Sequence, residues 1–471
     1  MKDIQTMIIL VLASLLIVGC ERQPANYYRK IIIGGKYEII GKYPVPDDIA
    51  NDVNCYYFIY NEKGKPTKIE YLKAGKLHTD PYLRVAQIII DYSDEYERWV
   101  FLNTKGKPTL NVDSIYSIRL KLDEHGYPVA LFNYNKKGKL IEDKNGVAQY
   151  LWTIDEKGRR VKTIMFDRAG NRVVDKNGFY EIRYKYDKKG NLIEQSNYGE
   201  NGLLLDGKNN FAIIRWKYDE EGNVIEESYY GSDQQLKEHK DLGVAIIHRE
   251  YDEYGNMVEE RYFGTDNQLK ERKDWGAAIR RFKYDGRGNM MEERYFGIDE
   301  QLKERSDWGI AIRRFKYDNH WNRIEERYFD SDRRPKERKD WGIAIRRIKY
   351  DDEGNPIEER YFGVDEQLKE RDDLGIAIRH LKYDENGNIV EVRFLGTDGQ
   401  PKEDKKNGIA IARFSYNEHG NRIEERYFGA DEKLKGLKNS GVAIIQREYD
   451  EEGNLVMTFY LDKFGRVISF K

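Results

Sequence analysis

The chain has 471 residues, of which 81 are basic and 83 acidic, so its charged fraction is 35%. This fraction exceeds the roughly 25% of typical globular domains, yet the formal net charge is only −2. Such a balance excludes a global electrostatic attraction to nucleic acid, and we therefore expect no nucleic-acid partner.

The first predicted element is an uncharged apolar run at residues 7–18, with Lys2 ahead of it. About a dozen residues are too few for a transmembrane helix, which needs roughly 20, and they suit the hydrophobic region of a secretory signal peptide. The run ends in IVGC at residues 17–20. An ordinary secretory signal that happens to end near a cysteine is the alternative interpretation.

The IVGC segment resembles the lipobox of bacterial lipoproteins, in which an aliphatic residue and small residues precede an invariant cysteine. The resemblance implies cleavage between Gly19 and Cys20, and lipidation of the Cys20 thiol and of the new amino terminus. Several acyl chains hold a protein stably at a membrane. We therefore expect a signal peptide at residues 1–19 and a lipid-anchored tether at residues 20–30.

Location in the bacterial cell envelope follows from the same resemblance. Glu21 comes directly after Cys20, and in lipoproteins of some bacteria the absence of Asp at this position favours the outer membrane. The sequence does not distinguish a periplasmic from a surface-facing orientation.

Residues 31–110 are predicted to form an irregular β region that caps the rest of the chain. Two strand-like runs lie in it, at residues 30–43 and 83–92. If Cys20 is acylated, Cys55 is the only remaining thiol, and no intramolecular disulfide can form. Cys55 lies in the strand-like run NCYYFIY and is predicted to be a small buried hydrophobe rather than a nucleophile.

Residues 111–471 are predicted to be a tandem repeat with a period of 32 to 33 residues. A YD step aligns the copies, and weaker copies occur at Asp123 and Asp155. A polar unit of this size cannot bury enough apolar surface alone, so neighbouring copies must stack. The anchor residues of the regular copies are Asp187, Asp219, Asp252, Asp285, Asp318, Asp351, Asp384, Asn417 and Asp450.

Each copy is predicted to contain two strands around a tight turn, as at residues 309–318 and 323–329. The YDxxGN junction supplies Asp as an acceptor and Gly for positive φ, which is typical of a type I turn closed by a bulge. A second turn follows, at residues 296–304 in one copy. A single helical turn competes at residues 299–308, but the glycines on both sides favour a strand or turn.

The predicted fold is therefore all-β, an elongated array of stacked antiparallel β-hairpin repeats. Tyr-Phe pairs, such as Tyr328 and Phe329, and the alanines equivalent to Ala311 are expected to form columns between copies. Basic residues at 312–316 would face acidic residues at 324–327, and facing opposite charges contribute roughly 0.2 to 1 kcal/mol per pair. We interpret these charges as a ladder of solvated pairs, with a dedicated ligand stripe as the alternative.

One copy departs from the turn rule, because Trp321 stands where its neighbours have Gly288 and Gly354. Bulky side chains adopt positive φ at an energetic cost that glycine avoids. We predict either that Asn322 takes the left-handed position or that this turn stores local strain.

The YDxxGN core, as at residues 186–191, resembles the YD repeat of bacterial Rhs proteins and related secreted proteins. Those proteins build hairpins into long strips that can wrap as shells. This chain differs in its longer period, and it has no recognisable self-cleavage core. The run at residues 134–143 is also similar, more distantly, to MORN-like repeats, which form ribbon sheets. Both resemblances imply surfaces for interaction rather than catalysis.

No catalytic, metal-binding or cofactor-binding signature occurs in the sequence. His125, His320 and His419 all fall in the same turn position of distant copies and cannot gather around one metal ion. Adjacent glutamates such as Glu325 and Glu326 point to opposite faces of a strand. We therefore predict that the chain is not an enzyme and uses no cofactor.

The predicted function is a lipid-anchored binding or scaffolding surface for a protein or glycan partner, whose weak contacts would sum along the array. The alternatives are a spacer that binds nothing and an enzyme with a site within residues 21–110. The sequence does not indicate the oligomeric state. The residues predicted for the interaction surface are Trp275, Trp308, Trp341, Tyr295, Tyr328 and Tyr361.

Overall fold

The computed structural model of the chain describes residues 26–73, 75–352, 354–385, 387–417, 421–449 and 455–470. The signal segment, Cys20 and His419 lie outside these residues. The described part forms one antiparallel sheet of 30 strands that is not closed, together with a single 3-10 turn, η1 (Ala50–Asp52). The predicted all-β array of hairpins is confirmed. No helix in the described ranges has the length and apolar character needed to span a membrane.

The N-terminal strands come first. They are β1 (Tyr27–Ile33), β2 (Ile39–Pro44), β3 (Cys55–Tyr60), β4 (Pro66–Lys73), β5 (Lys76–Leu77), β6 (Gln87–Tyr92), β7 (Tyr96–Leu102), β8 (Ser117–Leu122) and β9 (Pro128–Tyr134).

The remaining strands belong to the repeats. They are β10 (Gln149–Ile154), β11 (Arg160–Phe166), β12 (Glu181–Tyr186), β13 (Leu192–Tyr198), β14 (Ile213–Tyr218), β15 (Val224–Tyr230), β16 (Ile246–Tyr251), β17 (Met257–Phe263), β18 (Ile279–Tyr284), β19 (Met290–Phe296), β20 (Ile312–Tyr317), β21 (Arg323–Phe329), β22 (Ile345–Tyr350), β23 (Pro356–Phe362), β24 (Ile378–Tyr383), β25 (Ile389–Leu395), β26 (Ile411–Tyr416), β27 (Arg422–Phe428), β28 (Ile444–Tyr449), β29 (Leu455–Leu461) and β30 (Val467–Phe470).

The predicted turn chemistry is confirmed in the copies anchored at residues 187 to 384. In the hairpin of β20 and β21, the Asp318 carboxylate accepts the backbone N–H groups of His320 and Asn322, both at 2.9 Å. A bulge interrupts the register between Lys316 and Tyr317. The second turn forms no helix and instead closes with an isolated bridge, as between Phe296 and Leu302.

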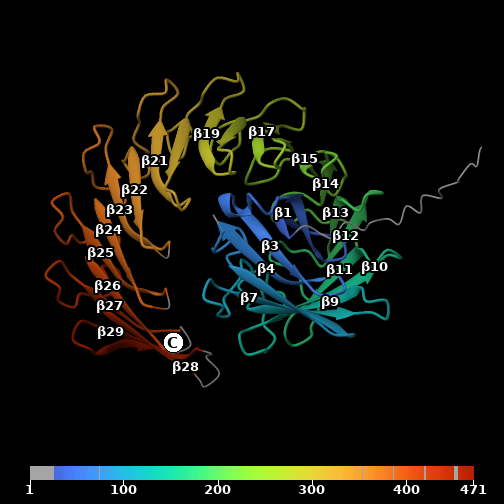
Figure 1. Cartoon of the computed structure of the whole chain (residues 1–471), viewed down its shortest axis with the longest axis horizontal. Coiled ribbons are helices and arrows are strands. Elements are labelled where there is room, and N and C mark those ends of the chain that lie inside the picture. The colour runs from blue at the N-terminus through green and yellow to red at the C-terminus, as the bar shows by residue number, and fades with distance from the viewer. Residues whose placement is uncertain are drawn as a thin grey trace, which may run out of the picture.

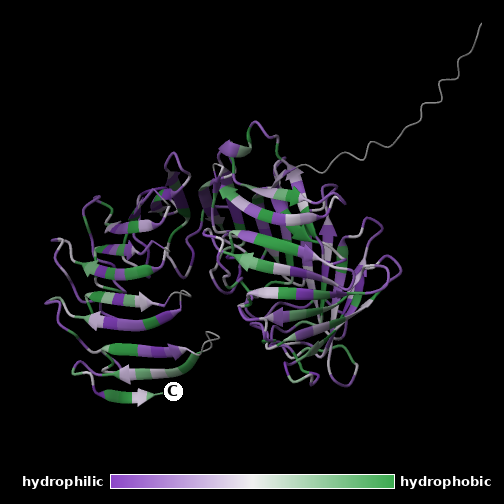
Figure 2. Ribbon diagram, turned by 60° about the horizontal axis from the view of Figure 1, so that its bottom comes forward, coloured by the Kyte–Doolittle hydropathy of each residue, from purple (hydrophilic) through white to green (hydrophobic). Residues whose placement is uncertain are grey.

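Alternation along the strands separates two faces of the sheet. The inner face, which lines a chamber in the N-terminal region, carries Phe315 and Tyr328 in the hairpin of β20 and β21, whereas the outer face carries Lys316 and Arg327. Figure 2 shows hydrophobic and hydrophilic residues along the same strands. Tyr328 and Ala311 are fully buried and pack in clusters that link neighbouring copies. The predicted columns are therefore present.

The sheet curls back on itself, so that the later repeats pass around the N-terminal strands (Figure 1). Turns at the YD steps meet these strands directly. The Lys42 Nζ donates to the Glu221 carbonyl at 3.3 Å, and an Arg29 guanidinium N–H donates to the Arg287 carbonyl at 2.5 Å. The N-terminal region thus lies alongside the repeats rather than only at their end.

The N-terminal strands are also part of the same sheet. Strand β1 pairs with both β2 and β3, and β4 continues to β6 and the rest of the array. Strand β1 begins at Tyr27, inside the segment predicted to be a tether. Cys55 is fully buried, and burial raises the pKa of its thiol to about 11, which confirms the predicted structural role.

Trp321 keeps the backbone conformation of the glycines that it replaces. Its φ is 61°, and Asn322 is not among the residues with positive φ, so the first alternative for this turn is wrong. The guanidinium of Arg287, from the preceding copy, lies 3.7 Å from the centre of a Trp321 ring. The turn thus combines an unfavourable backbone conformation with a favourable stacking contact.

We expect Trp321→Gly to stabilise the protein, because it removes a strained conformation that costs about 1 kcal/mol. The gain should be larger in an Arg287→Ala background, since the stack contributes about 0.5–1 kcal/mol in the wild type and is already absent there. Urea denaturation of the four proteins of this double-mutant cycle measures both effects. A lower midpoint for Trp321→Gly in the Arg287→Ala background would show that the turn is not strained.

Candidate functional site

The predicted tryptophans form part of a stack that runs between copies on the inner face. The Arg305 guanidinium lies 4.5 Å from the Trp275 ring centre and 3.7 Å from that of Trp308. The Arg338 guanidinium lies 4.1 Å from Trp308 and 4.0 Å from Trp341. Each such contact is worth about 0.5 to 2 kcal/mol, depending on its exposure. The tryptophans therefore hold successive copies together.

The predicted tyrosines lie deeper in the same face. Tyr295, Tyr328 and Tyr361 are each 0% exposed, and Trp275 is 4% exposed. Among the six residues predicted for an interaction surface, only Trp308 and Trp341 are half-buried. The described fold gives this set a packing role, and any accessible surface must be sought on the other face.

The inner-face charges are buried, which corrects the prediction that all these pairs are solvated. Arg313 binds Glu293 of the preceding hairpin at 2.9 Å and Glu326 of its own hairpin at 2.7 Å. The Glu326 side chain is only 3% exposed. Burial opposes its ionisation, but Arg313 and Arg323 outweigh burial and hold the Glu326 pKa below its ordinary value. Removing one partner of such a buried pair typically costs about 3–5 kcal/mol.

The outer face has a second, more accessible row of charges. The Glu325 carboxylate accepts hydrogen bonds from Arg327 at 2.7 Å and from Arg347 at 2.8 Å, and Lys316 lies 3.0 Å from it. Burial alone would raise the Glu325 pKa, but these three cations together lower it to about 2. The predicted pairing of Lys316 with Glu325 across the hairpin is confirmed.

A second carboxylate completes this arrangement in some copies. Glu366, in the turn after β23, reaches back to Arg327 and Arg347, both at 2.7 Å. We call such a pair of arginines with a carboxylate between them a filled clamp. Two further filled clamps occur, formed by Glu300 with Arg261 and Arg281, and by Glu432 with Arg393 and Arg413.

The copy that lies between the filled clamps of Glu300 and Glu366 lacks this second carboxylate. Arg294 and Arg314 share Glu292, at 2.5 and 2.6 Å, but Arg333 occupies the position equivalent to Glu300 and Glu366. We call this arrangement the open clamp. The Arg294 Nε finds no hydrogen-bond partner in the part of the chain that the structure describes.

The open clamp is accessible and chemically specific. The Arg294 and Arg314 side chains are 25% and 44% exposed, and Glu366 in the neighbouring filled clamp is 47% exposed. A guanidinium presents paired N–H donors that match the two oxygens of a carboxylate. The open clamp therefore presents N–H donors whose geometry matches a carboxylate.

A weaker version of the open clamp occurs two copies further along. Arg360 and His380 bind Glu358 at 2.8 and 2.9 Å, and Gly399 stands where a filled clamp has glutamate. Sequence reasoning missed both positions because it compared adjacent copies. The signal was the alternation at every second copy, in which Glu300, Glu366 and Glu432 interleave with Arg333 and Gly399.

The described residues offer no candidate metal site beside the clamps. No three metal-ligating side chains gather anywhere in the described ranges. His125 and His320 lie in turns of different hairpins.

Comparison with protein families and with curated proteins finds no match. Among solved structures, the TcdB2-TccC3-TEV crystal structure is similar at a TM-score of 0.39 and 11% identity, covering 94% of this chain and 24% of that chain. The Photorhabdus luminescens Tc holotoxin pore gives a TM-score of 0.37 at 12% identity, with 92% and 22% covered. This chain thus spans about a quarter of the length of those chains. A porin-like protein from Bacteroides uniformis gives a TM-score of 0.20 at 10% identity, with 59% and 86% covered.

The outer-face glutamates make stability dependent on acid pH. The pKa values of Glu325, Glu358 and Glu391 are lowered from 4.5 to about 2, so their contribution is complete above pH 4.5 and is lost as pH falls towards 2. We expect the melting temperature to fall across that interval. Glu325→Gln should destabilise the protein by about 1–3 kcal/mol near neutral pH, and should approach the wild type at the acid end.

The control for this experiment is Glu62→Gln, in an exposed turn. Its melting temperature should follow that of the wild type at every pH. A constant difference between Glu325→Gln and the wild type across the acid interval would contradict the assigned titration.

Proposed function

We propose that the protein is a lipid-anchored scaffold of the bacterial envelope that binds an acidic segment of a partner protein at the open clamp. The observation that carries this proposal is the contrast between neighbouring copies. Arg327 and Arg347 hold an internal carboxylate from Glu366, whereas Arg294 and Arg314 have Arg333 in its place. The Glu366 carboxylate in the filled clamp thus indicates which group a ligand would supply to the open clamp.

A single clamp supplies only modest affinity. Exposed ion pairs contribute about 0–1 kcal/mol each, so a useful partner must present several carboxylates at once. The two open positions, at Arg294 and at Arg360, are separated by two hairpins. Four strands at about 4.8 Å each give roughly 19 Å, which about six residues of an extended chain would span. An acidic extended segment therefore fits the spacing of the outer face.

Exchange of the clamp residues tests the proposal. A fluorescein-labelled peptide of glutamates serves as the probe, and its anisotropy is followed on titration with the full chain at low salt. We expect Arg333→Glu to fill the clamp and weaken binding about ten-fold. Glu366→Gln should open a clamp in the adjacent copy and strengthen binding.

The matched control is Arg333→Gln, which removes the charge without supplying a carboxylate. Its effect should be clearly smaller than that of Arg333→Glu. Equal losses for the two variants would mean that only net charge matters, and the clamp would then have no specific role. Binding of a polyuronate glycan but not of the peptide would contradict the assignment to a protein partner, and binding of neither would favour the spacer.

Lipid anchoring is a separate part of the proposal, and it is supported by the sequence at Gly19 and Cys20 alone. We expect Cys20→Ala to move the protein from the membrane to the soluble fraction, because the acyl chains are its only proposed attachment. Fractionation and immunoblotting measure this shift, and protease treatment of intact cells shows which side the array faces. Membrane retention of a processed Cys20→Ala protein would contradict the anchor.

A further inference from the structure

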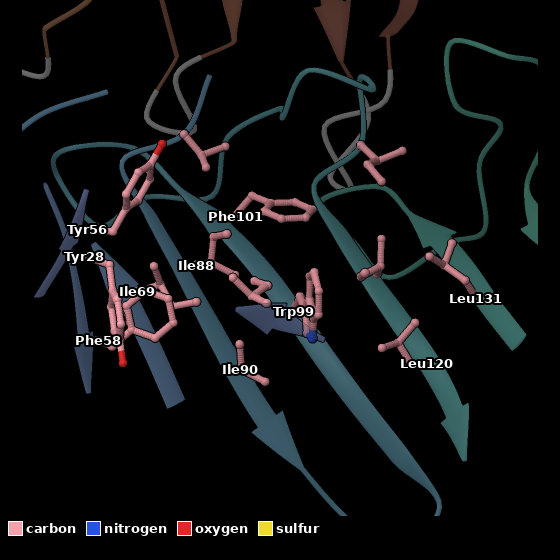
Figure 3. Packing of buried hydrophobic residues seen from close by; sticks show 14 of the residues in the cluster. Tyr28, Tyr56, Phe58, Ile69, Ile88, Ile90, Trp99, Phe101, Leu120 and Leu131 are labelled. Atoms are coloured by element: carbon pink, nitrogen blue, oxygen red, sulfur yellow. The ribbon is translucent and has the colours of Figure 1, made fainter. Parts of the chain in front are cut away.

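The inner face lines a partly open chamber in the N-terminal region that the proposed function does not use. The strands from β6 to β12 curve around the hairpin of β1 and β2 and leave a cavity of about 330 Å³. Ile88, Trp99 and Leu131 form part of its apolar wall (Figure 3), and Ile31 and Ile39 of the hairpin face them.

The hairpin is fixed in this position by close contacts at its tip. The backbone N–H of Arg160 donates to the Gly35 carbonyl at 3.1 Å. A Cβ atom on Gly35 would lie 2.9 Å from the Tyr186 ring, so only glycine allows this approach. The Tyr37 ring packs against Trp99 and Trp152, with ring centres 5.5 and 5.0 Å apart. These contacts fix the position of the hairpin and, with it, the shape of the chamber.

Buried polar atoms without partners lie together on one part of the chamber wall. Thr163 and Trp152 face each other across β10 and β11, and they are 2% and 8% exposed. Their Oγ1 and Nε1 atoms, and the Arg160 Nε, have no hydrogen-bond partner among the described residues. Burial of such groups without partners costs stability. A ligand that supplies an acceptor would satisfy all three.

Arg160 places a positive charge beside these atoms. The Arg160 guanidinium lies 5.0 Å from the Tyr37 ring centre, 5.1 Å from Trp152 and 5.4 Å from Tyr184. It forms no ion pair within the described ranges, whereas both carboxylates that line the chamber have partners of their own. Asp113 pairs with Lys144 at 2.9 Å, and Asp143 accepts a hydrogen bond from Tyr150 at 2.5 Å.

We infer that the chamber binds an apolar molecule with a single anionic head, of the size of a medium-chain fatty acid. The carboxylate would accept hydrogen bonds from Arg160, Trp152 and Thr163, and the hydrocarbon chain would lie along Ile88 and Leu131. A cavity of about 150 Å³ holds benzene, so 330 Å³ accommodates about a dozen non-hydrogen atoms. Decanoate matches that size, whereas a diacyl lipid is too large.

Calorimetric titration of the full chain with decanoate tests this inference, with decan-1-ol as the uncharged counterpart. We expect one decanoate per chain and at least a ten-fold weaker affinity for the alcohol. Arg160→Met should weaken decanoate binding by a similar factor, because it keeps an apolar side chain but removes the charge. Arg183→Met, whose charge lies on the outer face, should leave binding unchanged.

Thr163→Val separates a ligand-binding role from a purely structural one. The substitution removes a hydroxyl without a partner, so the melting temperature of the free protein should rise, while decanoate affinity should fall several-fold. The inference is overturned if the folded wild type binds no decanoate, or if acid and alcohol bind equally well. It is also overturned if Thr163→Val or Arg160→Met leaves the affinity unchanged. None of these results bears on the open clamp, which lies on the outer face.

Discussion

The buried bridges between arginine and glutamate on the inner face join the middle hairpins of the array, where Arg280 and Arg313 each bind glutamates of two hairpins. A polar unit of 33 residues cannot form a core of its own, so its stability must come from its neighbours. Arg313 joins Glu293 of one hairpin to Glu326 of the next, and the fully buried Tyr328 packs beside it. Each such arginine binds a glutamate of its own hairpin and one of the preceding hairpin, and so joins neighbouring copies. Ile247 and Ala412 occupy the equivalent positions in copies on either side, where apolar packing replaces the bridge.

The curl of the sheet gives the N-terminal region its role. The contacts of Arg29 and Lys42 with YD turns join strands that are far apart in sequence, and Figure 1 shows the later repeats passing around the N-terminal strands. The hairpin of β1 and β2 lies against the inner face instead of extending away from it, and Gly35 permits that approach. The region thus contributes the inner wall of a chamber as well as the first strands of the array.

The sequence was sufficient to predict the hairpins, because the rules of the turn are local. Asp318 as an acceptor, a residue with positive φ three positions later and the bulge that closes the turn all follow from the residue types of the YDxxGN junction. The burial of Glu326 and Tyr328 could not be predicted in this way, since alternation assigns residues to a face but does not show what covers that face. The curl and the chamber depend on contacts such as that between Arg160 and Gly35. These residues are far apart in the sequence, so no local pattern predicts that they meet. Trp321 shows a further limit of prediction from local sequence. Its contact with Arg287 of another copy helps to offset the cost of its positive φ.

The two faces differ in what a substitution costs, and the proposed function uses that difference. On the inner face, substitution of Arg313 or Glu326 would remove one partner from buried charges, a cost comparable with a large part of a protein's total stability. On the outer face, the position of Glu366 is half exposed, and from residue 300 to residue 432 its equivalents alternate between glutamate and either arginine or glycine. Change at that position alters the surface charge of the copy without opening the core. A repeat array can therefore keep its hairpins and buried columns and still change the surface charge at chosen copies, and under the proposed function such a change gives a repetitive sequence one distinct site.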